Sequence, residues 1–141
     1  RTSRHVYCLM SDGEQEEGNI WEAAMFAGKN KLSNLTAVMD RNNIQIDGNA
    51  DDVMPLEPLV DKYKAFNWNV FDVNGHDIPV LLAAFKASAG VRGKPTMIIA
   101  RTTPGKGVSF MENKFEWHGK PPNAEEGEKA LAELRAAALK L

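Results

Sequence analysis

The chain has 141 residues, of which 43% are hydrophobic and 26% are charged, and its formal net charge at pH 7 is −2. This length and composition predict a single domain with a substantial core, and they exclude the strongly basic surface typical of nucleic-acid-binding proteins. No apolar run approaches the length of a membrane span, so we expect no membrane contact and a cytoplasmic location. The single cysteine, Cys8, excludes a disulfide framework.

Short apolar runs and helical patterns alternate along most of the chain. In chain order, they predict strands at 6–10, 35–39, 67–73 and 96–101, and helices at 19–32, 58–66, 78–89 and 124–141. We expect the first two strands to be buried, with Cys8 as an inert thiol inside the first. Alternation of this kind predicts an α/β fold with a mostly parallel sheet and helices on both of its faces.

Three single residues add detail to this pattern. Gly28 lies inside the first predicted helix, where glycine costs up to about 1 kcal/mol relative to alanine, and it indicates a close crossing with another helix. Asp77 is expected to cap the helix that begins after it. His76 is expected to order the same turn and helix start.

Residues 102–123 interrupt the alternation. This segment is rich in glycine, proline and polar residues, and irregular segments of such length are usually functional or disordered. The predicted helix that follows carries Leu131, Leu134, Ala138 and Leu141 at helical spacing. We interpret this stripe as packing on the sheet, in preference to a partner-binding face.

Two polar segments follow the first two predicted strands, Ser-Asp-Gly-Glu-Gln-Glu-Glu-Gly at 11–18 and Asp-Arg-Asn-Asn-Ile-Gln-Ile-Asp-Gly at 40–48. The carboxyl ends of parallel strands meet at one edge of a sheet, where open α/β folds bind ligands. Asp12 and Asn42 can then reach one hard cation from two sides, and the turn at Gly13 can offer backbone N–H groups to a phosphate. This combination suits a magnesium-bridged diphosphate.

Each of these residues also has an ordinary structural interpretation. Asp12 can cap the following helix, Asn42 can stabilise a turn, and Gly13 can be a turn glycine. An EF-hand at 40–48 is excluded, because Ile44 and Gln45 occupy places that need an oxygen ligand and a glycine. A P-loop at 104–107 is excluded as well, because the upstream glycine and the Ser or Thr after the lysine are absent.

The sequence resembles the transketolase family along almost its whole length. The stretches that carry the resemblance are, in chain order, Asp12-Gly13 with Glu17-Gly18, Trp21-Glu22-Ala23, Ala27-Gly28, residues 42–48, Asn74-Gly75-His76-Asp77, Lys94-Pro95-Thr96, residues 101–107 and Trp117-His118-Gly119. One departure is Ser11, where the family motif usually has glycine. The resemblance implies a single, N-terminally truncated thiamine-diphosphate-binding domain at 1–141.

The resemblance also implies the site and its cofactors. It implies thiamine diphosphate with Mg²⁺, for which Ca²⁺ or Mn²⁺ can substitute. The metal is assigned to the side chains of Asp12 and Asn42 and to the carbonyl of Ile44. The diphosphate is assigned to the N–H of Gly13, and the thiazolium ring is placed over Ile46, for which an ordinary core position is the alternative.

Three further residues receive roles from the resemblance. His118 is placed against the diphosphate and the sugar hydroxyls, where an imidazole can act as an acid or base near neutral pH, so it is the candidate catalytic residue. A loop histidine without a role is the alternative. Glu17 and Glu22 are placed in a carboxylate–water network at a dimer interface, and solvated surface positions are the alternative for both.

For the activity, the resemblance implies transfer of a two-carbon ketol unit between sugar phosphates in the pentose phosphate pathway, with the cofactor as electron sink. We expect the chain to be part of an enzyme. A separate pyrimidine-binding transketolase chain or domain should complete the active site, and self-association into a homodimer or heterotetramer is expected. The alternatives are a non-catalytic subunit or relic that keeps the fold, and another thiamine-diphosphate enzyme. The latter class includes deoxyxylulose-phosphate synthase and the first component of a 2-oxoacid dehydrogenase.

Overall fold

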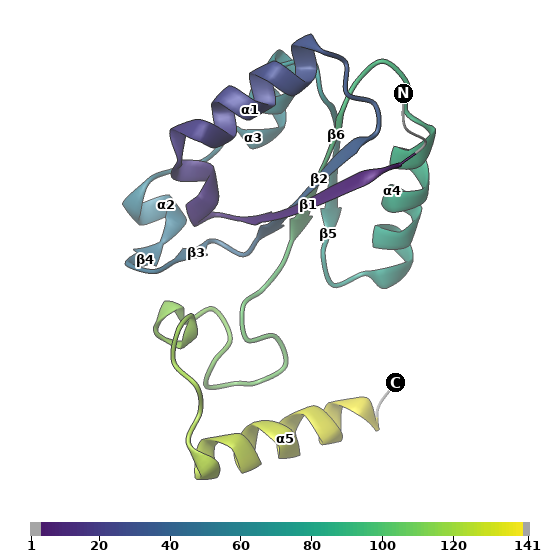
Figure 1. The fold of residues 1–141 in the computed structure, drawn as a ribbon. Coiled ribbons are helices and arrows are strands. Elements are labelled where there is room, and N and C mark those ends of the chain that lie inside the picture. The colour runs from purple at the N-terminus through teal and green to yellow at the C-terminus, as the bar shows by residue number, and fades with distance from the viewer. Residues whose placement is uncertain (1–3, 140–141) are drawn as a thin grey trace.

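The computed structural model describes residues 4–139 (Figure 1). Within them, a four-stranded parallel sheet has the order β1-β2-β6-β5, formed by β1 (Val6–Ser11), β2 (Leu35–Arg41), β6 (Thr96–Arg101) and β5 (Asn69–Asn74). The helices α1 (Gly18–Lys29) and α3 (Leu59–Ala65) cover one face, and α4 (Ile78–Gly90) covers the other (Figure 1). The predicted α/β fold with helices on both faces is therefore confirmed.

Several short elements were not predicted. The strands β3 (Ile44–Gln45) and β4 (Gly48–Asn49) form a small antiparallel pair, and α2 (Ala50–Val53) follows directly. Single 3₁₀ turns lie at Gly13–Glu16 and Phe115–Trp117. Elements of this length show no periodicity in a sequence, because one turn or one strand pair contains too few side chains to form a pattern.

The main core lies between the sheet and the pair α1–α3. Its fully buried members include Met39, Leu59, Tyr63, Met97 and Ile99. The close helix crossing expected at Gly28 is confirmed, because a Cβ there would overlap the carbonyl oxygen of Phe66 at the end of α3. The expected cap at Asp77 is confirmed too: its side chain accepts a hydrogen bond from Val80 N at 3.0 Å.

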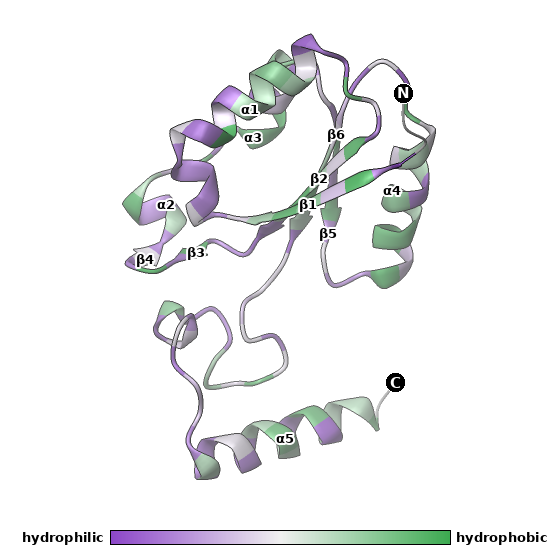
Figure 2. Cartoon of the chain, in the orientation of Figure 1, coloured by the Kyte–Doolittle hydropathy of each residue, from purple (hydrophilic) through white to green (hydrophobic). Residues whose placement is uncertain are grey.

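The first strand differs from the prediction. Among the described residues, β1 is an edge strand that pairs on one side only, with β2. Its side chains are largely exposed: Leu9 to 73% and Tyr7 to 54%. Cys8 is exposed as well. The expectation of a buried strand with a buried thiol is therefore wrong for residues 6–9, because β1 lies at the open side of the sheet (Figure 2); Met10 alone keeps a place in the core.

The last helix also differs from the prediction. Residues 102–123 lead the chain past the carboxyl edge of the sheet to α5 (Ala124–Ala138), which lies apart from the strands (Figure 1). It packs on the preceding segment instead: Ser109 donates its N–H and its hydroxyl to Glu133 at 2.6 and 2.9 Å, and Gly107 adjoins Leu134. Leu131 and Leu134 stay 44% and 42% exposed, so the expected packing of the stripe on the sheet is wrong. Leu141 lies outside the described residues.

None of the helices within residues 4–139 combines the length and the apolar character that crossing a membrane requires.

Candidate functional site

The two polar segments meet at the carboxyl edge of the sheet, as the sequence predicts. β1 and β2 pair in register up to Ser11 and Asp40, so the chain leaves both strands side by side. The carboxylate of Asp12 then reaches the second segment, where its Oδ2 accepts a hydrogen bond from Asn43 N at 2.7 Å. Its Oδ1 lies 3.0 Å from Nη1 of Arg41. Asp12 thus joins two segments that are far apart in the sequence.

Asp12 is completely shielded from solvent, with 0% of its surface exposed. Burial raises the pKa of its carboxyl, whereas the charge of Arg41 and the N–H groups of Asn43 and Asn42 lower it, and the net direction is upward. Oδ1 has the ion pair with Arg41 but no aligned hydrogen bond within the described residues. A buried carboxylate oxygen with this capacity left is a fitting ligand for a hard cation.

Asn42 lies beside Asp12 but has local partners. Its Oδ1 accepts a hydrogen bond from Ile44 N at 2.8 Å, and its Nδ2 donates to Asp40 Oδ2 at 3.3 Å. This is the turn-stabilising arrangement that its sequence context also allows. An amide oxygen has a second lone pair, so the hydrogen bond leaves Asn42 capacity for one more partner.

The predicted ligand set contains one carboxylate, one amide oxygen and one carbonyl. Within residues 4–139, no group of three or more His, Cys, Asp or Glu residues is placed to hold a metal ion. The candidate cation site therefore depends on oxygen donors of mixed kinds, which is a chemistry that Mg²⁺ accepts when phosphate oxygens and water complete its shell.

An open cavity of about 370 Å³ adjoins this edge of the sheet. Its walls bring together candidate residues from distant parts of the chain: Gly13, Glu17, Ile44, Ile46 and His118, with Ser11, Glu14, Glu16, Gln45 and Asp47 between them. Ile46 is 82% exposed there, which rules out the ordinary core position for it. Asp12 does not line the cavity, since its side chain is covered.

Serine at position 11 is accommodated without strain. Ser11 is the last residue of β1, and its backbone is not in the left-handed region that would favour glycine. Its N–H and hydroxyl both donate to Glu14 Oε2, at 2.8 and 3.1 Å. These bonds hold the start of the 3₁₀ turn that carries Gly13.

Glu17 and Glu22 are both exposed. Glu17 precedes α1 and lines the cavity, whereas Glu22 lies on the helix itself. The two positions agree with the solvated-surface interpretation within this chain, and their place in a dimer interface stays a prediction.

His76 does more than order its turn. Its N–H donates to Asn74 Oδ1 at 3.0 Å, as expected, but its ring Nε2 also accepts a hydrogen bond from Thr103 N at 2.7 Å. Nearby, the hydroxyl of Thr102 donates to Asp40. These contacts fasten the start of segment 102–123, which carries His118, to the carboxyl edge of the sheet.

Arg41 received no role from the sequence, although it lies between Asp40 and Asn42. Its side chain is only 5% exposed and forms ion pairs with Asp12, Asp51 and Glu57. Arg101 continues this network to Glu57 and Asp72, at 2.8 and 2.9 Å. A basic residue inside an acidic segment was the one sequence signal for a role of Arg41. Its partners could not be predicted, because they come from other segments of the chain.

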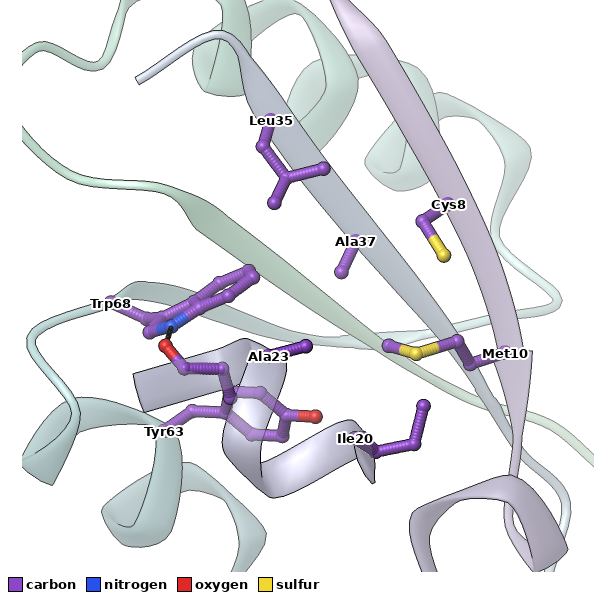
Figure 3. A pocket seen from close by; sticks show the side chains of 9 residues that line it. Cys8, Met10, Ile20, Ala23, Leu35, Ala37, Tyr63 and Trp68 are labelled. Atoms are coloured by element: carbon purple, nitrogen blue, oxygen red, sulfur yellow. Dashed lines mark hydrogen bonds between the residues drawn. The ribbon is translucent and has the colours of Figure 1, made fainter. Parts of the chain in front are cut away.

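A second pocket, of about 140 Å³, lies under the open edge of the sheet between β1, β2 and α1 (Figure 3). Its walls are almost entirely apolar, formed by Cys8, Met10, Ile20, Ala23, Ala24, Leu35, Ala37, Tyr63 and Trp68. The polar atoms at its margin are engaged: Trp68 Nε1 donates to the carbonyl of Ala24 at 2.8 Å, and the Tyr63 hydroxyl donates to Gln15 at 2.6 Å. This pocket offers nothing to a diphosphate.

Known proteins share both the sequence and the fold. Residues 2–137 match the family described as transketolase, thiamine diphosphate binding domain. The chain is 44% identical over 129 residues to one subunit of an apulose-4-phosphate transketolase from Phocaeicola vulgatus, a match that covers 92% of this chain and 46% of the relative. A 6-deoxy-6-sulfo-D-fructose transketolase subunit from a Clostridium species is also 44% identical, with 92% and 47% covered.

Among solved structures, the transketolase of Campylobacter jejuni superposes with a TM-score of 0.85 and 34% identity, covering 91% of this chain and 20% of that one. The chain spans about half the length of the two relatives named above. The match over nearly the whole chain, together with the fold, is decisive for the family. This chain belongs to the transketolase family and corresponds to its thiamine diphosphate-binding domain.

Proposed function

We propose that the chain is the diphosphate- and metal-binding part of a transketolase, which transfers a two-carbon ketol unit between sugar phosphates with thiamine diphosphate and Mg²⁺. The observation that carries this proposal is the convergence at one sheet edge: Asp12 meets the segment of Asn42 and Ile44, and the adjoining cavity reaches His118. The wider setting, a pentose phosphate enzyme of the cytoplasm, belongs to the same proposal.

The metal would be held by Asp12 through its buried Oδ1, by the Asn42 amide oxygen and by the Ile44 carbonyl, with Ca²⁺ or Mn²⁺ as substitutes. Gly13 begins the 3₁₀ turn after β1, where its backbone N–H would be offered to the diphosphate. Ile46 supplies an exposed apolar surface beside them for the thiazolium ring. When bound, thiamine diphosphate supplies the electron sink for ketol transfer.

His118 supplies an imidazole to a cavity whose other titratable side chains are carboxylates. Its backbone N–H donates to the carbonyl of Phe115 at 2.8 Å, which anchors the residue at the end of a 3₁₀ turn, and its side chain is exposed toward the cavity. From this position the imidazole would donate a hydrogen bond to the diphosphate and hold or release a proton at a sugar hydroxyl.

The remaining part of the active site would come from a pyrimidine-binding transketolase chain, in an assembly whose self-association places Glu17 and Glu22 at an interface. Two relatives that match nearly all of this chain are named as transketolase subunits, which supports a divided enzyme. Their names as transketolases favour ketol transfer over the chemistry of other thiamine-diphosphate enzymes.

The decisive experiment separates binding from turnover. Calorimetry should show thiamine diphosphate binding to this chain that depends on Mg²⁺, while a purified preparation of the chain alone should show no ketol transfer. Activity should return when a pyrimidine-domain partner is added. Turnover by the chain alone would contradict the divided site, and binding without activity in any reconstituted assembly would favour the non-catalytic subunit.

A further inference from the structure

Arg41 is the last residue of β2 and lies at the junction of the two polar segments. Each nitrogen of its guanidinium faces an oxygen from another part of the chain. Nη1 lies 3.0 Å from Asp12 Oδ1 and donates to Asn43 Oδ1 at 3.1 Å, and Nη2 donates to Asp51 Oδ1 at 2.7 Å. Nε lies 3.5 Å from Glu57 Oε1. The planar fork of arginine allows such divergent contacts, which the single ammonium of lysine cannot reproduce.

Asn43 is the residue through which these contacts hold the loop. Its backbone is in the left-handed region, at φ 62°, which costs a residue other than glycine some stability. Four hydrogen bonds keep it there: Arg41 Nη1 and Asp51 N donate to its Oδ1, Ala50 N donates to its carbonyl, and its own N–H donates to Asp12. Arg41 therefore fixes Asn43, and with it the residues on either side.

Those neighbours are Asn42 and Ile44, the two donors proposed to share a cation with Asp12. The arrangement is thus a clamp that sets the distance between the end of β1 and the loop after β2. The charge of the buried guanidinium is compensated, because it faces the three carboxylates of Asp12, Asp51 and Glu57. Asp51 and Glu57 are 53% and 41% exposed, so they balance Arg41 from the solvent side while Asp12 lies buried.

We propose that Arg41 is a positioning residue for the cation and diphosphate site, one that assembles Asp12, Asn42 and Ile44 before any cofactor binds. This inference rests on the proposed function. Residues that do not bind the metal but hydrogen-bond to its ligands and orient them commonly affect metal affinity about 10- to 100-fold when they are changed. Arg41 acts in this way through Asp12 and Asn43.

The test compares Arg41→Met and Arg41→Lys with Arg101→Met. Arg101 is the matched control, because it shares Glu57 with Arg41 but is bonded to Asp72 and not to Asp12 or Asn43. A second control, Met97→Ala, lowers global stability from a fully buried core position away from the loop. Affinity for Mg²⁺ at fixed thiamine diphosphate is measured by calorimetry, and amide hydrogen exchange of residues 42–50 is measured without any cofactor.

Arg41→Met should weaken Mg²⁺ binding about 10-fold or more and accelerate exchange at 42–50, relative to both controls. Arg41→Lys keeps the charge and guards against a variant that does not fold; it should show the same changes to a smaller degree. Unchanged affinity and exchange in the Lys variant, or equal changes in Met97→Ala, would overturn the positioning role. Wild-type chain that binds no thiamine diphosphate would instead refute the proposed function itself.

Discussion

The neighbouring strands β1 and β2 have similar apolar sequences, but β1 is exposed along most of its length and β2 is not. Both are apolar runs, they pair in register, and each leads into half of the candidate site. Met39 on β2 is fully buried, whereas Leu9 on β1 is 73% exposed. The difference shows that an apolar sequence makes a strand suited to burial. Its position in the sheet decides whether other parts of this chain bury it.

The residue after β1 is buried, unlike most of that strand, and its substitution has the largest expected effect. Asp12 is fully buried and paired with Arg41, so Asp12→Ala would leave a buried guanidinium without its innermost partner. We expect a loss of about 3–5 kcal/mol in the free energy of unfolding, together with loss of Mg²⁺-dependent binding of thiamine diphosphate. Urea unfolding and calorimetry measure the two effects separately. Unchanged affinity in a folded variant would remove Asp12 from the metal site.

The strands themselves are compared by one truncation in each. Met39→Ala should lower the free energy of unfolding by about 2–5 kcal/mol, because it opens a cavity in the core. Leu9→Ala should change it by less than about 0.5 kcal/mol in this chain alone. Urea unfolding of both variants tests the contrast directly. Equal losses would mean that β1 is covered in solution, and the description of β1 as an open edge would then be wrong.

The next test concerns His118, whose substitution should affect the site but not the stability of the fold. Its side chain is exposed on segment 102–123, so His118→Ala should leave the thermal stability of the cofactor-free chain nearly unchanged. In an enzyme reconstituted with its partner, the lost hydrogen bond of about 1.5–3 kcal/mol should lower kcat/KM roughly 10- to 100-fold. A large fall in stability without cofactor would favour a structural role, and full activity would exclude His118 from the site.

The smallest expected effect depends on pH. Burial raises the pKa of Glu57. Hydrogen bonds from Arg101 and Leu59 N, together with the charges of Arg101 and Arg41, lower it by more than burial raises it, so the net shift is downward from 4.5. The folded chain therefore gains stability from ionised Glu57 above that value and loses it as the pH falls below it. Because Glu57 is 41% exposed, the loss should stay below about 1 kcal/mol. Glu57→Gln should flatten the acid limb of the stability curve; an unchanged limb would contradict this.

Much of the fold and part of the site could be predicted from the sequence, for identifiable reasons. The alternation of elements was readable because each element is long enough to show its period. The meeting of Asp12 with the segment at 42–44 was predictable because parallel strands share one carboxyl edge. The clamp of Arg41 was not, since Asp51 and Glu57 reach it only through the unpredicted path of α2. The exposed β1 and the position of α5 depend on topology, which no local pattern contains.

One contact of His76 assigns a tautomer to its ring. Its Nε2 accepts the Thr103 N–H, so this nitrogen carries no hydrogen and the neutral ring must hold its proton on Nδ1. NMR shifts of the ring nitrogens would reveal the tautomer. The segment that carries His118 is therefore attached at its start through the ring lone pair of another histidine, and a side chain without an acceptor at this place would leave the Thr103 N–H without its partner.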